Sequence, residues 1–144
     1  MGRIEETARL PAAPADVWAV AADPARFGEW LRMHRSWQGD PPSQFAAGDQ
    51  VTAVVSLLNL PTTITWTVEE YEAPTRVRFA GKGLANIDIS IELDVTADGS
   101  DASAVTVIAE FAGQLLTGPI EQAVETAARA EVHSSIARLT ELVG

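Results

Sequence analysis

The chain has 144 residues, 47% of them apolar and 21% charged, a composition typical of one folded domain and not of a disordered chain. Twenty acidic and ten basic residues give a formal net charge of −10, which repels phosphate backbones and anionic membranes, so nucleic acid is not an expected ligand. No cysteine is present, which excludes disulfides and thiolate chemistry, and no segment has the pattern of a membrane span or a secretory leader. We therefore expect a single cytoplasmic domain over residues 1–144.

The first ten residues alternate between apolar and charged side chains, which predicts a strand that ends at a proline. Pro14 then suits the first position of a helix over about residues 15–22. Asp23 followed by Pro24 is the N-cap and first-turn pair of a second short helix, which carries Phe27, Trp30 and Leu31 on one face.

A strand stub around Trp37 and a loop rich in proline and glycine come next. Turn residues then separate five longer strand candidates, which cover residues 51–58, 62–72, 75–81, 85–96 and 104–113. Apolar residues alternate with Thr, Arg, Asp and Glu along most of them, which predicts antiparallel hairpins with one apolar face and one wet face. Segment 51–58 is apolar on both sides, so its inward face stays open.

From Pro119 the periodicity becomes helical and continues for more than twenty residues. The helical wheel places Ile120, Val124, Ala127 and Ala128 on an inward stripe and His133 on the solvent side. The whole order predicts an α+β fold in which a curved antiparallel sheet of about six or seven strands wraps around the C-terminal helix, with two short helices after the first strand.

The motifs near the N-terminus are Pro14, the Val17–Trp18 pair, the Asp23–Pro24 step and Trp30. Together they resemble the SRPBCC superfamily of START proteins, polyketide cyclases and dehydrases, and birch-pollen allergens. The segments "EWLRMHRSW", "LPTTITWTVEEYEAP" and "TGPIEQAV" are similar to a small actinobacterial branch that includes toxins of toxin–antitoxin pairs. The resemblance implies a helix-grip fold with a ligand cavity between the sheet and the last helix.

His34 lies between Trp30 and Trp37, where the resemblance places the rim of that cavity. It is either a rim histidine that binds a substrate carbonyl or, as we favour, an exposed loop histidine. Glu131 falls within the apolar arc of the last helix, where a carboxylate either faces a ligand or reaches solvent at the edge of the stripe; both alternatives remain open.

The aromatic residues either line the cavity or fill a core, and the small side chains of Ala123, Ala127, Ala128 and Ala130 favour unfilled space beside the helix. The two histidines lack a metal-binding pattern, so we expect no metal site and no cofactor. Glu110 is expected to face water, and Trp18 to anchor the first helix to the sheet.

The leading hypothesis is a protein that binds a hydrophobic or aromatic small molecule. Its candidate ligand-binding residues are Trp30, His34, Trp37, Trp66, Phe79, Phe111, Ala127 and Glu131, with Tyr71 or Asn59 as further polar contacts. One alternative is an enzyme of the polyketide cyclase or dehydratase kind with Glu131 as its acid or base. Another is a toxin-like interaction protein, and the sequence leaves open a homodimer or a protein partner.

Overall fold

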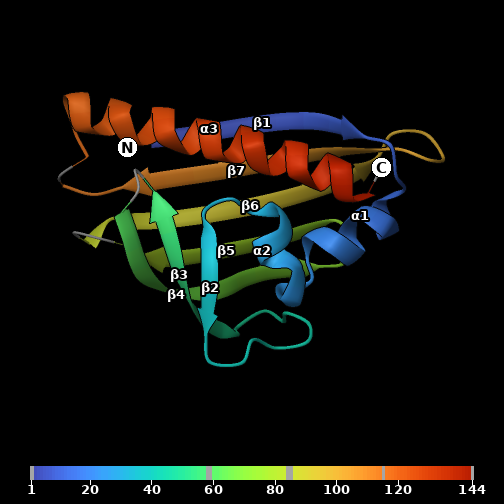
Figure 1. Ribbon diagram of the computed structural model, residues 1–144, viewed down its shortest axis with the longest axis horizontal. Coiled ribbons are helices and arrows are strands. Elements are labelled where there is room, and N and C mark those ends of the chain that lie inside the picture. The colour runs from blue at the N-terminus through green and yellow to red at the C-terminus, as the bar shows by residue number, and fades with distance from the viewer. Residues whose placement is uncertain (1, 58–59, 84–85, 115, 144) are drawn as a thin grey trace.

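The computed structural model describes residues 2–57, 60–83, 86–114 and 116–143. It contains seven strands and a long C-terminal helix in these ranges, with short helical segments after the first strand (Figure 1). The strands are β1 (Gly2–Leu10), β2 (His34–Gln38), β3 (Gln50–Leu57), β4 (Leu60–Glu72), β5 (Arg76–Lys82), β6 (Asp88–Ala97) and β7 (Ser103–Ala112). The helices are α1 (Pro14–Ala21), a 3₁₀ turn (Pro24–Arg26), α2 (Phe27–Trp30) and α3 (Gly118–Val143).

All seven strands form one antiparallel sheet in the order β1-β7-β6-β5-β4-β3-β2. Strands β2 to β7 follow one another as neighbours, and β1 closes the order by pairing with β7, with Gly2 opposite Phe111 and Leu10 opposite Ser103. Helix α3 packs mainly against β1, and α1 and α2 lie against α3 on the same side of the sheet (Figure 1). The predicted helix-grip architecture is confirmed.

Local hydrogen bonds hold the short helical segments that follow β1. The Asp23 carboxylate accepts a hydrogen bond from the backbone N–H of Ala25 at 3.0 Å, and Pro24 occupies the first helical position, as the sequence predicted. In α1, the buried Trp18 donates from its Nε1 to the Tyr71 hydroxyl at 3.2 Å. This bond ties α1 to β4, so Trp18 anchors the helix to the sheet.

The buried stripe of α3 differs from the predicted one. It consists of Val124, Ala128, Val132, Ser135, Ile136 and Leu139. Ile120 is 57% exposed, so its place on the inward stripe was wrong: residues 118–120 are all exposed because the first helical turn does not pack on the sheet. Ala123 and Ala130 are exposed as well, and the solvent position of His133 is confirmed.

Ser135 fixes α3 against the connection between α2 and β2. Its hydroxyl donates to the backbone oxygen of Glu131 at 2.7 Å and accepts from the backbone N–H of Arg32 at 2.9 Å. Residues 31–33 are thereby held beside the helix.

The two faces of the sheet have the expected chemistry. Along β3, Val51 and Ala53 are buried, which settles the face that the sequence left open. The outer face carries ion pairs, such as Arg76 Nε to Asp94 Oδ1 at 2.8 Å and Arg78 Nε to Glu69 Oε1 at 2.9 Å. Glu110 also lies on this outer face, as expected, 3.9 Å from Arg78. Within the described ranges, no helix has the length and apolar content needed to cross a membrane.

Candidate functional site

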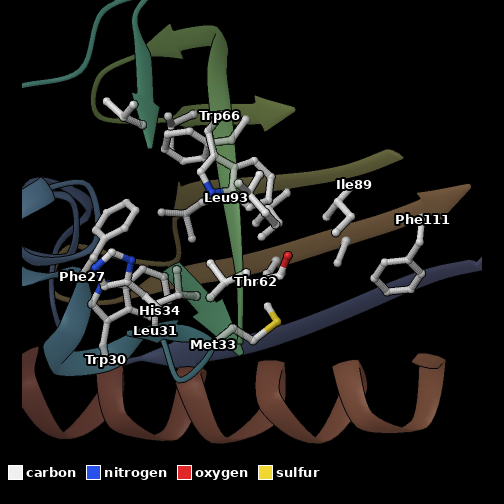
Figure 2. Close-up of a pocket in the computed structure, with 18 of the residues that line it drawn as sticks. Phe27, Trp30, Leu31, Met33, His34, Thr62, Trp66, Ile89, Leu93 and Phe111 are labelled. Atoms are coloured by element: carbon white, nitrogen blue, oxygen red, sulfur yellow. The ribbon is translucent and has the colours of Figure 1, made fainter. Parts of the chain in front are cut away.

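An internal cavity of about 170 Å³ lies between the inner face of the sheet and the segment from α1 to β2 (Figure 2). This segment contributes Ala21, Phe27, Trp30, Leu31, Met33, His34 and Trp37 to its wall. Strands β3 and β4 contribute Val51, Val55, Leu60, Thr62, Ile64 and Trp66. The rest of the wall is formed by Val77, Phe79, Ile87, Ile89, Ile91, Leu93, Val107, Ala109, Phe111 and, from α3, Val124.

The cavity wall is almost entirely apolar. No Asp, Glu, Lys or Arg is present among its described residues, and its polar side-chain atoms are three indole nitrogens, the His34 imidazole and the Thr62 hydroxyl. A dry apolar cavity of ~150 Å³ is large enough to admit benzene. A space of this size and chemistry can therefore hold an aromatic ring or a short alkyl body, and it offers few polar contacts to orient one.

Phe27 organises the aromatic end of the cavity. Its ring centroid lies 6.1 Å from that of Trp30, 6.0 Å from His34 and 5.5 Å from both Trp37 and Phe45. Edge and tilted contacts of this kind hold each ring in one orientation. Sequence reasoning missed Phe45, which is 1% exposed; the only signal was a single aromatic residue in an otherwise polar loop.

His34 begins β2 and is only 9% exposed, so the favoured interpretation as an exposed loop histidine was wrong. The chain turns inward here because the His34 backbone N–H bonds to the Leu31 oxygen and the ring packs on Trp37, with 4.6 Å between centroids. Burial lowers the pKa of His34, which favours the neutral imidazole at neutral pH.

The indole groups of Trp30 and Trp37 differ in their hydrogen bonding. Trp37 donates from Nε1 to the backbone oxygen of Pro24 at 2.8 Å, which holds the turn before α2 against β2. Trp30 is 4% exposed, and its Nε1 is buried without a partner among the described residues. Of these two indole N–H groups, that of Trp37 is satisfied within the protein and that of Trp30 is not.

Six of the eight candidate ligand-binding residues line the cavity, namely Trp30, His34, Trp37, Trp66, Phe79 and Phe111. Ala127 and Glu131 are half-buried and do not line it. The reason is the path of α3, which runs beside β1 and contributes only Val124 to the described wall. Helical periodicity gives the relative angles of side chains, but not the part of the sheet over which each turn lies.

The two further polar candidates do not add to the described wall. The Tyr71 hydroxyl accepts from Trp18, and Tyr71 does not line the cavity. Asn59 lies outside the described residues. Thr62 and Met33, which sequence reasoning passed over, are both half-buried and line the cavity on the side near α3 (Figure 2).

Known proteins are similar to this chain over all or nearly all of its length. A family model described as "Polyketide cyclase / dehydrase and lipid transport" matches residues 1–144. The uncharacterized protein Rv1546 of Mycobacterium tuberculosis is 28% identical over 144 residues, which is 100% of both chains. Toxin Rv0910 of the same organism is 28% identical over 136 residues, which is 94% of each chain.

A solved structure supports the architecture independently. The START superfamily protein from Mycobacterium smegmatis superposes with a TM-score of 0.79 at 12% identity, covering 98% of this chain and 96% of its own. Similarity at this level of identity shows a shared fold.

Proposed function

Because the chain belongs to the polyketide cyclase / dehydrase and lipid transport family, we propose that its cavity binds a hydrophobic or aromatic small molecule. The main observation in support is the wall of the 170 Å³ cavity, which has no charged side chain among its described residues. Burial of apolar ligand surface is favourable by about 25 cal/mol per Å² and needs no specific partner. The sparse polar groups then set orientation.

The shape of the wall is also consistent with ligand access. Leu60 at the start of β4 is 54% exposed although it lines the cavity, and Met33, Thr62 and Ile87 are half-buried. By contrast, Phe27 and Trp30 are buried. We place the opening beside Leu60 and the closed end at Trp30.

The direct test is native mass spectrometry of the protein as purified from cells, followed by thermal shifts with neutral aromatic and lipid-like compounds. A ligand that binds only the folded state raises Tm in proportion to the logarithm of its concentration above Kd. We expect at least one neutral aromatic compound to raise Tm. Binding in this cavity is refuted if nothing co-purifies and no compound of either class raises Tm.

An enzyme of the cyclase or dehydratase kind is the second candidate function. The geometry of the cavity changes which residue would be its general base. Glu131 does not line the cavity, whereas His34 is the single titratable side chain among the described wall residues. A general base must lie within hydrogen-bond reach of the proton that it removes. In a polyketone cyclisation assay we therefore expect Glu131→Gln to preserve ligand binding and any turnover, and His34→Gln to abolish turnover. The opposite result would restore Glu131 as the base.

The toxin-like alternative stays a prediction that depends on relatives such as Rv0910, which is named a toxin. The cytoplasmic location and the homodimer or protein partner likewise stay predictions from the sequence.

A further inference from the structure

The two edges of the sheet differ in how they are protected from pairing with another chain. Strand β2, at one edge, has five residues, and its register shifts between His34 and Ser36. Helix α2 packs beside it, and a loop that contains Pro41 and Pro42 follows the strand. A short strand, an irregular register, nearby proline and a covering helix all blunt the edge of a sheet. The β2 edge is therefore a poor template for a further strand.

Strand β1, at the other edge, has none of these devices. It runs through nine residues without a proline, and its pairing with β7 is continuous from Gly2 opposite Phe111 to Leu10 opposite Ser103. Among the described strands it pairs only with β7, and it lies at the upper margin of the sheet in Figure 1. One side of β1 thus presents a row of backbone N–H and C=O groups that can pair with another extended segment.

An inward-pointing charge, a further protection of sheet edges, is neutralised in β1. Ile4 and Leu10 are buried on the inner face, where α3 packs on the strand. Glu6, the charged residue on this face, is half-buried and lies 4.0 Å from the Arg129 guanidinium of α3. Its charge is balanced within the protein, so the inner face does not prevent a further strand from joining.

The outer face of β1 is complementary in charge to itself. A second copy can pair with β1 in the antiparallel direction across a two-fold axis, which brings side chains of the same face opposite one another. When the axis passes through Thr7, Glu5 of one copy lies opposite the partner's Arg9, because both are two residues from the axis. The symmetry repeats this pair, so two pairs of opposite charge flank the axis. Residues 4–10 of each copy meet in this register.

Other registers are less favourable. An axis at Glu6 places Arg3 opposite the partner's Arg9, and an axis at Glu5 places two carboxylates together. Like charges directly opposite each other on adjacent strands are destabilising. An axis nearer the start of the strand again pairs opposite charges, but only residues 2–6 of each copy then meet. The register centred on Thr7 combines opposite charges with the longer overlap.

We propose that two copies of this chain associate through β1, in the antiparallel direction and with Thr7 on the two-fold axis, so that their sheets form one continuous sheet. Backbone hydrogen bonds between the two edges hold the copies together, and the Glu5–Arg9 pairs set the register. The interface is independent of the proposed function, because no residue of β1 is among the described residues that line the cavity.

The absence of cysteine from the chain makes a cross-linking test specific. Opposed residues on antiparallel strands have Cα atoms about 4.5–5.5 Å apart, a distance that a disulfide spans. Under mild oxidation we expect Thr7→Cys to form a covalent dimer, detected by non-reducing electrophoresis. Glu5→Cys alone and Arg9→Cys alone should stay uncross-linked, because each thiol lies about 14 Å from its symmetry mate. A mixture of these two variants should give the mixed covalent dimer.

Sedimentation velocity tests the charge pairs without a cross-link. Glu5→Arg and Arg9→Glu each place like charges opposite each other, so each should raise the Kd of the dimer by roughly tenfold. The chain that carries both substitutions regains two pairs of opposite charge and the net charge of −10, so its Kd should return to that of the wild type. The matched control is Arg138→Glu, which makes the same charge change at an exposed ion pair of α3 and should leave the Kd unchanged.

Both reversed side chains are exposed, so each variant should keep the wild-type Tm, measured by circular dichroism. A wild type that sediments as a monomer at every concentration would overturn the β1 interface. So would a dimer that survives both single reversals, that the combined reversal fails to restore, or that Arg138→Glu weakens equally. Cross-linking of Glu5→Cys alone as fast as Thr7→Cys, or no cross-link in Thr7→Cys, would refute the register. None of these results bears on ligand binding in the cavity.

Discussion

Filling the cavity should stabilise the protein and abolish binding, and Ile91→Phe is the substitution that tests this. Ile91 lies on β6 between Phe79 of β5 and Ala109 of β7, all three of which line the cavity. At about 24 cal/mol per Å³, an empty space of 170 Å³ corresponds to about 4 kcal/mol of unrealised stability. Phenylalanine adds about three carbon atoms, each worth about 0.8 kcal/mol when fully buried.

Since the added ring will not contact the wall on every side, we expect a gain of about 1–2 kcal/mol in the free energy of unfolding. For a chain of this length the gain corresponds to a rise in Tm of roughly 3–8 °C, measured by circular dichroism. The affinity for 2-acetylnaphthalene, measured by calorimetry, should fall at least about tenfold because the ring occupies ligand space.

The matched control is Ile108→Phe, which makes the same chemical change on the outer side of β7, beside Ala109 but away from the cavity wall. It should leave affinity unchanged. A lower Tm for Ile91→Phe together with wild-type affinity would show that no usable space exists beside Ile91, and the cavity argument would fail.

Two further predictions concern the surroundings of the cavity, one on glycine substitutions and one on pH. A Cβ at Gly81 would lie 2.8 Å from the backbone oxygen of Thr65, so Gly81→Ala should lower the free energy of unfolding, measured in urea, by about 1–3 kcal/mol. A Cβ at Gly83 would instead lie 2.9 Å from the flexible end of the Ile89 side chain, so Gly83→Ala should lower it by less. Equal losses of stability in the two variants would contradict this account. Burial lowers the pKa of His34, so the unfolded chain takes up its proton first and stability falls as pH drops below about 6.5, by at most about 1.4 kcal/mol per pH unit. In thermal melts from pH 7.5 to 5.5, His34→Gln should lose less stability than the wild type, and parallel profiles would refute the neutral buried histidine.

The element order could be predicted from the sequence because it depends on local rules. Turn residues separated the strands after residue 50, and period-two alternation identified most of them. The observed bounds differ from the predicted ones by a few residues at most where the structure describes them. The cap at Asp23 was predictable for the same reason, since its partner, the Ala25 amide, is two residues away.

The candidate site was only partly predictable. Trp30, Trp37 and Trp66 were named because large aromatic side chains suit the wall of the cavity that the resemblance implied, and all three line it. Glu131 was named from helical angle alone, and the path of α3 beside β1 leaves it outside the wall. Phe45 escaped notice because its burial against Phe27 and Phe79 joins a loop to distant elements.

The sequence by itself determined the composition of the core, the succession of strands and helices, and the family to which they belong, because each of these follows from neighbours along the chain. Only the tertiary structure decided that His34 is buried and that Trp30 lacks an acceptor while Trp37 has one. The physical reason is that hydrogen-bond satisfaction depends on atoms brought together across the fold, and two tryptophans seven positions apart along one chain can meet entirely different neighbours.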